Sequence, residues 1–185
     1  MLPYEKYLQE ILIDEQTLQS RVRELGAEIS QDYADCTDLL LLCILKGGIM
    51  FLADLTRHIS VPHEIDFLAV SSYGKGARAS SGNVRIDMDL SEEIGGRHIL
   101  IVEDIIDSGQ TLRFVMDVLQ ARRPASINLC TLLDKSEMRT VDIPIAYRGF
   151  EIENKFVFGY GLDLDEKFRN LPFIGVVKKD MIVND

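Results

Sequence analysis

The sequence predicts an α/β protein with a mainly parallel, twisted sheet and helices on both of its faces. Two runs, 39–45 and 99–102, are continuously apolar, as in strands that are covered on both faces. Each run leads through a short polar or glycine-containing loop into apolar residues at helical spacing. This order of strand, loop and helix favours a parallel sheet, with ligand sites at the carboxyl ends of the strands.

The composition fits a single globular domain that spans all 185 residues. The formal net charge of −10 argues against broad binding to nucleic acid or to an anionic membrane, so we expect neither as a partner. No apolar segment approaches the length of a membrane span. The three cysteines have no metal-binding spacing and are expected to be reduced core residues of a cytoplasmic protein: Cys36, Cys43 and Cys130.

The amino-terminal segment is expected to form a packing helix without chemistry of its own. Its apolar side chains share one helical face: Leu18, Val22, Leu25 and Ile29. Asp14 is the expected N-cap, and Gly26 is a weak point of the helix. The apolar run 39–45 then ends in Lys46-Gly47-Gly48 before a second helix. Taken alone, these three residues are a strand-to-helix turn with a solvated lysine.

The next segment predicts a strand at 65–70, a loop at 71–82 and an alternating strand at 84–90. The loop is small, polar and rich in glycine, without periodicity, so we expect it to be mobile. It is either a plain hairpin connection or a lid that closes over a site to exclude water.

The central stretch, ILIVEDIIDSGQTL, combines a buried strand, two acids and a polar loop before a helix. Glu103 and Asp104 follow the apolar run directly, where buried carboxylates are costly unless something binds them. The N–H groups at the start of the following helix suit an anion such as phosphate. In the plainer interpretation, Asp107 or Ser108 only caps the helix and Gly109 only makes a turn. That interpretation leaves Glu103 and Asp104 unexplained.

The remaining pattern predicts a helix at 112–119 and strands at 127–133 and 173–177. The strand at 127–133 ends at Asp134-Lys135. No histidine follows a metal or nucleophile pattern, and we assign no role to any of them: His58, His63 and His98.

The segment VEDIIDSGQTL resembles the phosphoribosyl diphosphate (PRPP) motif of type I phosphoribosyltransferases. Its particular residues resemble those of the hypoxanthine-guanine branch. The resemblance implies that Glu103 and Asp104 lie by the ribose hydroxyls and Mg²⁺. It implies that Asp107 is the general base, which exchanges a proton with N7 of the purine. The implied 5′-phosphate loop consists of Ser108, Gly109, Gln110 and Thr111. Some relatives carry Thr and Lys at positions 108 and 110, so here the loop N–H groups are expected to carry phosphate binding.

Two shorter motifs extend this resemblance toward the amino terminus. Leu45-Lys46-Gly47-Gly48 resembles the family's pyrophosphate loop, in which the peptide bond before the lysine can be cis. Lys46 and Gly47 are therefore expected to bind the diphosphate of PRPP. Ser72 and Tyr73 match the Ser-Tyr pair of the family's flexible active-site loop, which favours the lid interpretation.

The segment KFVFGYGLD resembles a motif of the branch that binds 6-oxopurines. It implies that Phe156 stacks on the purine and that the backbone at Val157 bonds its edge. Lys135 stands at the position that reads the 6-oxo group. Asp163 matches a carboxylate that helps to hold a second Mg²⁺, and Arg169 matches an arginine near the pyrophosphate.

These motifs together imply a Mg²⁺-dependent purine salvage enzyme that joins hypoxanthine, and guanine, to the phosphoribosyl group of PRPP. One alternative is an enzyme that prefers xanthine. Another is a non-catalytic relative that senses PRPP or binds RNA, because fold does not fix function. The family's fold implies a core at about residues 35–150 and a small hood from the amino- and carboxyl-terminal segments. The family also implies a homo-oligomer, dimer or tetramer.

Overall fold

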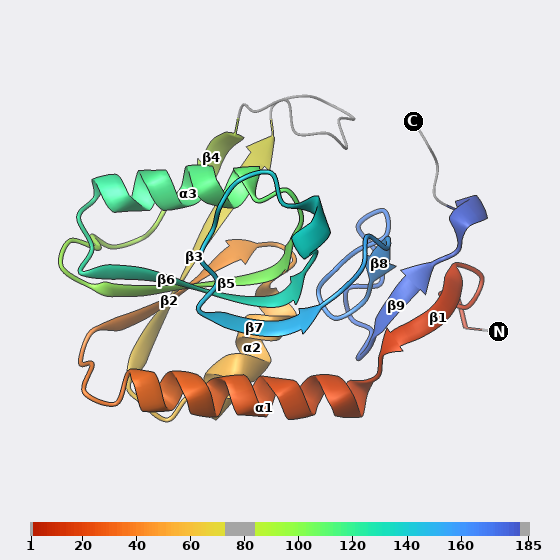
Figure 1. Cartoon of the computed structure of the whole chain (residues 1–185), viewed down its shortest axis with the longest axis horizontal. Helices are drawn as coiled ribbons and strands as arrows, with labels where there is room; N and C mark the ends of the chain where they lie inside the picture. The colour runs from red at the N-terminus through yellow and green to blue at the C-terminus, as the bar shows by residue number, and fades with distance from the viewer. Residues whose placement is uncertain (1, 73–83, 182–185) are drawn as a thin grey trace.

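The structure of the chain, a computed structural model, describes residues 2–72 and 84–181 (Figure 1). The strands in these two ranges are β1 (Leu8–Ile13), β2 (Leu39–Leu45), β3 (His63–Ser72), β4 (Val84–Met88), β5 (His98–Ile106), β6 (Ser126–Asp134), β7 (Tyr147–Glu151), β8 (Val157–Phe158) and β9 (Ile174–Val177). The α-helices in them are α1 (Glu15–Asp32), α2 (Ile49–Leu55) and α3 (Gln110–Ala121). Short 3₁₀ helices lie at η1 (Thr56–His58), η2 (Ser136–Met138) and η3 (Lys179–Met181).

The main sheet contains six strands in the order β4-β3-β2-β5-β6-β7. All neighbouring strands are parallel except β3 and β4, which are antiparallel. Helices α1 and α2 cover one face of this sheet, and α3 covers the other (Figure 1). The predicted fold class is confirmed.

The continuous apolar runs follow from this cover on both faces. In β2, Leu39, Leu41 and Cys43 belong to the core beneath α1 and α2. The alternate residues Leu40 and Leu42 belong to the core beneath α3. Because side chains of a strand point alternately to its two faces, neither face leaves room for a polar position in this strand.

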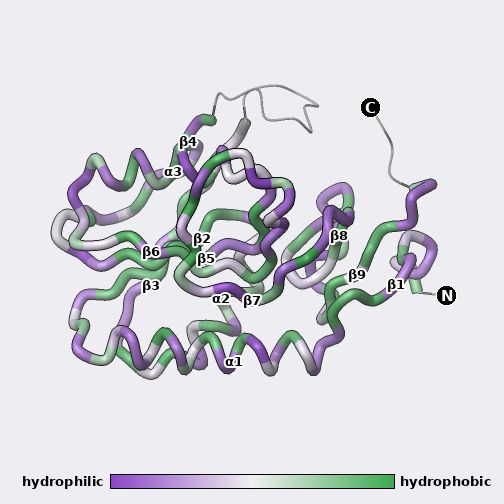
Figure 2. The backbone as a smooth tube through the Cα atoms, viewed as in Figure 1, coloured by the Kyte–Doolittle hydropathy of each residue, from purple (hydrophilic) through white to green (hydrophobic). Residues whose placement is uncertain are grey.

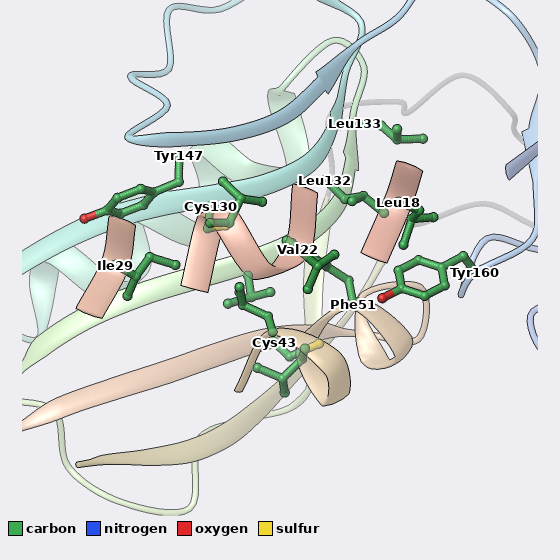
Figure 3. Packing of buried hydrophobic residues seen from close by; sticks show 14 of the residues in the cluster. Leu18, Val22, Ile29, Cys43, Phe51, Cys130, Leu132, Leu133, Tyr147 and Tyr160 are labelled. Atoms are coloured by element: carbon green, nitrogen blue, oxygen red, sulfur yellow. The ribbon is translucent and has the colours of Figure 1, made fainter. Parts of the chain in front are cut away.

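Helix α1 packs its predicted apolar face against the sheet. The side chains on this face are fully buried: Leu18, Val22, Leu25 and Ile29. Figure 3 shows Leu18, Val22 and Ile29 among the buried side chains, with Val22 next to Phe51 of α2, and Figure 2 shows the alternation of apolar and polar residues along the helix. Asp14 is the N-cap, since its Oδ1 accepts a 2.8 Å hydrogen bond from the amide of Thr17. The prediction for this element is confirmed.

Gly26 is a packing position of α1. A Cβ atom there would lie 2.5 Å from Cβ of His58 and 2.8 Å from its carbonyl carbon and oxygen. Glycine therefore lets α1 approach η1 closely, which the helix pattern alone does not reveal.

A second sheet, of three antiparallel strands in the order β1-β9-β8, lies beside the main sheet (Figure 1). It joins a segment near the amino terminus to two segments near the carboxyl terminus. Its own cluster of buried side chains includes Phe158, Leu171 and Phe173. Strand β1 is absent from the sequence prediction, because half of its residues are exposed and its buried and exposed positions do not alternate.

Other predicted elements differ from the structure at their ends. The predicted strand at 99–102 is part of β5, which continues through Glu103 and Asp104 to Ile106. The acidic pair therefore lies within the strand. Helix α3 begins at Gln110, two residues before the predicted start. Among the residues that the structure describes, no helix combines the length and apolar character of a membrane span.

Candidate active site

The chemistry-bearing residues converge at the carboxyl ends of β2, β5 and β6. These three strands are neighbours in the main sheet, and parallel strands end at the same edge. Strand β2 delivers Lys46 and Gly47, β5 delivers the acidic pair and the loop that follows it, and β6 delivers Lys135. Segments far apart in the sequence thus meet at one edge.

Glu103 and Asp104 are set deeply into this edge. Oδ1 of Asp104 accepts a 2.9 Å hydrogen bond from the amide of Ile105. Oε2 of Glu103 is buried and has no hydrogen-bond partner among the described residues. Burial raises the pKa of Glu103 well above its ordinary value, and the charge of Asp104 adds to this effect. Burial also raises the pKa of Asp104 to about 6. Such a pair is suited to a cation or to hydroxyl donors.

The turn after β2 packs against Asp104. The Leu45–Lys46 peptide bond is cis, as expected. A Cβ atom at Gly47 would lie 1.7 Å from Oδ2 of Asp104, and one at Gly161 would lie 2.0 Å from the carbonyl oxygen of Gly47. Only glycine fits at either position. The turn is therefore held between the acidic pair and the loop that contains Gly161.

The loop after β5 forms an open cradle at the start of α3. Gly109 is the N-cap residue, with φ of 82°. Oγ of Ser108 accepts a 3.4 Å hydrogen bond from the amide of Gln110, the first residue of α3. The plainer interpretation is therefore wrong about the N-cap position but right that Ser108 contacts the start of the helix and that Gly109 makes the turn. A cavity of about 230 Å³ lies against this loop, next to Glu103 and Thr111. A helix start beside a cavity offers N–H groups to an anion.

Asp107 and Lys135 form an ion pair across the edge. Oδ1 of Asp107 lies 2.9 Å from Nζ of Lys135, whose side chain is 9% exposed, while that of Asp107 is 56% exposed. The amide of Lys135 also donates to the carbonyl oxygen of Ile106. A nearly buried cation thus faces an accessible carboxylate, an arrangement that suits proton transfer with a bound base.

Val157 begins β8 of the second sheet, and Phe156 directly precedes it. Val157 is buried and pairs with Val176 of β9. The ring of Phe156 is 38% exposed, whereas that of Phe158 is fully buried. Phe156 is thus an accessible aromatic side chain on a backbone fixed by its neighbours.

Asp163 and Arg169 lie in one cluster of charges with Lys46 and Glu166. Arg169 lies 2.9 Å from Asp163 and 3.2 Å from Glu166. Glu166 also lies 2.9 Å from Lys46, and its amide donates to Oδ2 of Asp163. The predictions include the other three residues but not Glu166. Glu166 stands three residues before Arg169 in the sequence, and this spacing is the local signal that could have identified it. In the structure, Asp165 and Glu166 also have positive φ values.

The lid prediction concerns residues that are mostly outside the description. Ser72 ends β3, where its backbone pairs with Val84 of β4. Tyr73 and the rest of the expected lid lie outside the described residues.

Comparisons with known proteins point in one direction. The sequence profile of the phosphoribosyl transferase domain matches residues 9–165. The hypoxanthine phosphoribosyltransferase of Salmonella typhimurium is 46% identical over 173 residues, which cover 93% of this chain and 97% of that protein. The hypoxanthine-guanine phosphoribosyltransferase of Streptococcus thermophilus is 43% identical over 177 residues, with 96% and 97% covered.

Solved structures agree with these relatives. A crystal structure of a hypoxanthine phosphoribosyltransferase from Staphylococcus aureus superposes with a TM-score of 0.91 at 42% identity, over 97% of this chain and 96% of that one. The matched region contains the acidic pair, the cradle of α3 and Lys135. The chain therefore belongs to the type I phosphoribosyltransferase family and, within it, to the hypoxanthine-guanine branch.

Proposed function

We propose that this protein transfers the phosphoribosyl group of PRPP to hypoxanthine, and to guanine, and so serves purine salvage. The observation that carries the proposal is the meeting of the acidic pair, the cavity at the start of α3 and the Asp107–Lys135 pair at one edge of the sheet. A ligand with a phosphate, hydroxyls and a base would use all three features at once.

The purine would lie between the edge of the main sheet and β8. Asp107 is the proposed general base, since its carboxylate is accessible and lies against Lys135. Lys135 would donate to the 6-oxo group, and Phe156 would stack on the ring. The backbone at Val157 would bond the remaining edge of the base. These contacts hold N9 of the purine in line with C1 of the ribose.

PRPP would bind at the same edge of the main sheet, on the side away from the purine. The amide groups around Ser108, Gly109, Gln110 and Thr111 would bind its 5′-phosphate. The turn at Gly47 would direct backbone dipoles at the diphosphate, and Lys46 and Arg169 would add positive charge beside it. In this arrangement the protein holds both reactants and stabilises the negative charge of the leaving group.

Mg²⁺ fits the acidic residues of this site. Oε2 of Glu103, which has no partner in the described part of the chain, and the adjacent carboxylate of Asp104 offer the oxygen ligands that this ion prefers. Asp163 is a weaker candidate, since both of its oxygens already have partners. No group of three or more acidic, histidine or cysteine side chains in the described part of the chain forms a metal site by itself, which suits an ion that also binds substrate phosphates. When bound, Mg²⁺ would neutralise charge on the diphosphate.

A turnover assay with PRPP and four bases tests the proposal. We expect product with hypoxanthine and guanine and little with adenine, because a lysine donor suits a 6-oxo acceptor and adenine carries a 6-amino group instead. Xanthine shares the 6-oxo group, so its turnover relative to hypoxanthine separates the proposal from the xanthine-preferring alternative. Faster turnover of xanthine than of hypoxanthine would support the xanthine-preferring alternative. PRPP binding without turnover of any base would support a PRPP-sensing regulator.

Further expectations extend the proposal to the whole molecule. We propose a homo-oligomer, dimer or tetramer, which light scattering after size exclusion would reveal. We also propose a cytoplasmic location, and one domain in which the β1-β9-β8 sheet acts as a hood over the base. A photoactivatable base analogue that crosslinks to Phe156 would test the hood.

A further inference from the structure

Asp134 is the most deeply buried acid whose role the proposed reaction leaves open. It ends β6, directly before Lys135, and is 1% exposed. Its carboxylate forms ion pairs with two arginines that approach from different segments. Oδ1 pairs with Arg139, and Oδ2 lies 2.9 Å from Nε of Arg148. A buried carboxylate with two cations fixes their positions, because leaving any member unpaired is costly.

Arg139 extends this buried pair to the phosphate loop. Its Nε donates a 3.1 Å hydrogen bond to the carbonyl oxygen of Asp107. The next residue, Thr140, donates to the carbonyl oxygen of Ser108 twice, from its amide at 3.0 Å and from its hydroxyl at 3.2 Å. Two successive carbonyl groups of the loop are therefore bonded to the segment behind it.

We call residues 139–143 the brace, because they also pack against the loop. A Cβ atom at Gly109 would lie 2.7 Å from Cδ1 of Ile143 and 3.1 Å from side-chain atoms of Arg139 and Val141. The brace thus fills the space behind the loop and leaves the cavity on its other side.

These contacts also fix the direction of the loop's N–H groups, because of the geometry of the peptide bond. In a trans peptide, the carbonyl and N–H groups point in opposite directions. With the carbonyls of Asp107 and Ser108 directed at the brace, the N–H groups of Ser108 and Gly109 are directed away from it. Those N–H groups belong to the residues that line the cavity.

We propose that Asp134 and Arg139 are positioning residues for the phosphate loop: Asp134 fixes Arg139, and Arg139 fixes the orientation of the loop's amides through the backbone carbonyl of Asp107. The proposal rests on the proposed binding of PRPP at this loop. It explains why a charged pair is buried at the end of β6 beside the residue that is proposed to read the base.

Arg139→Gln and Arg148→Gln form a matched pair of variants. Each removes one of the two cations bound to Asp134, but Arg148 has no contact with the loop among those described. Its other contacts are Glu151 and, through its carbonyl, Arg21. We expect both variants to unfold at a lower temperature than the native protein. Only Arg139→Gln should bind PRPP more weakly, by roughly tenfold, the effect of losing one hydrogen bond to a charged group.

Calorimetric binding of PRPP and of hypoxanthine separates positioning from a merely structural role. Arg139→Gln should weaken PRPP binding and leave hypoxanthine binding within about twofold, since a general loss of structure would weaken both. Equal effects of the two variants on PRPP binding, or a change below about twofold in Arg139→Gln, would overturn the proposal.

Arg139→Lys covers the case in which Arg139→Gln does not fold. Lysine keeps the charge beside Asp134 but has no planar fork to reach a second acceptor. We expect near-native thermal stability with PRPP binding still weakened; full recovery of PRPP binding would contradict the bridging role of Arg139. These variants are compared by PRPP binding, which is measured directly, so a failure of the positioning proposal appears there. A failure of the proposed function appears separately, as the absence of turnover by the native protein.

Discussion

At the scale of single residues, the site holds ionisable groups that are shielded from the water that would otherwise stabilise their charges. Lys135 is almost buried and pairs with a half-exposed carboxylate, while Glu103 has a buried oxygen without a partner in the described chain. An arrangement of this kind costs stability in the free protein. It becomes favourable when a ligand supplies the missing partners, so function and stability are in opposition at these positions.

Replacing Asp107 with Asn tests its proposed role as general base. Asn keeps the size of the side chain and a hydrogen-bonding oxygen but no longer accepts the proton. We expect kcat at saturating hypoxanthine to fall by about 10²–10⁴-fold, the usual contribution of general base catalysis. PRPP affinity should change much less, because the loop amides remain. A kcat close to the native value would remove Asp107 from the mechanism.

Replacing Glu103 with Gln should stabilise the free protein at pH 8. Burial raises the pKa of Glu103 in the folded state, so its ionisation opposes folding once the pH exceeds the ordinary carboxyl pKa. We expect Glu103→Gln to raise Tm by a few degrees at pH 8, since about 1 kcal/mol shifts Tm by about 2–4 °C at this size.

The same comparison at pH 5 tests whether ionisation of Glu103 causes this effect. Because pH 5 lies close to the ordinary carboxyl pKa, the penalty for ionisation is small there, and the gain in Tm should shrink. Glu92→Gln is the matched control, because Glu92 is exposed and should leave Tm unchanged at both pH values. A gain in Tm for Glu103→Gln that is equal at pH 5 and pH 8 would show that its ionisation has no part in the effect.

At the scale of elements, the patterns that depend on near neighbours in the sequence predicted the structure well. The apolar runs of β2 and β5, the N-cap at Asp14 and the buried face of α1 are all set by local spacing. The two-residue β8 and the exposed β1 were not predicted, because each is defined by pairing with β9 across the sequence. Family motifs, not periodicity, predicted most of the candidate site residues. Glu166 and Arg139 were not among the predictions, because their contacts with Lys46 and with the carbonyl of Asp107 join segments that lie far apart in the sequence.

Gly26→Ala separates helix propensity from packing in α1. Alanine is the better helix former by about 1 kcal/mol, but its Cβ would overlap His58 of η1. We expect a net loss of about 1–3 kcal/mol in the free energy of unfolding, the usual cost of overpacking, measured with urea. Ala27→Gly is the matched control at the next, exposed position and should cost about 1 kcal/mol by propensity alone. A more stable Gly26→Ala protein would refute the close contact.

At the scale of the whole molecule, the site joins the main sheet to segments near the carboxyl terminus. The contact of Gly161 with the carbonyl of Gly47 brings the two parts together. Tyr160 adds a 2.6 Å hydrogen bond to Asp54 of α2, which Gln19 of α1 also contacts. A net charge of −10 means that an anionic substrate depends on local cations. The cluster around Arg169 supplies them at this junction.

Glu166→Gln tests whether that cluster is held for the diphosphate by an internal carboxylate. Glu166 pairs with both Lys46 and Arg169, and the hydrogen bond from Lys46 lowers the pKa of Glu166 below its ordinary value. An incoming diphosphate needs the same two cations and would have to displace this carboxylate. We expect Glu166→Gln to lower the Kd for PRPP by about two- to fivefold, a range that matches the small contribution of exposed ion pairs.

The thermal stability of Glu166→Gln should stay close to that of the native protein, because its ion pairs are exposed. Glu153→Gln is the matched control, since Glu153 pairs with Lys155 outside the cluster, and it should leave PRPP binding unchanged. The gain in affinity should also be larger at low ionic strength, where the competing charge is least screened. Weaker PRPP binding by Glu166→Gln would give the opposite answer: the carboxylate would then serve to orient Lys46 and Arg169 toward the diphosphate, and its removal would release them.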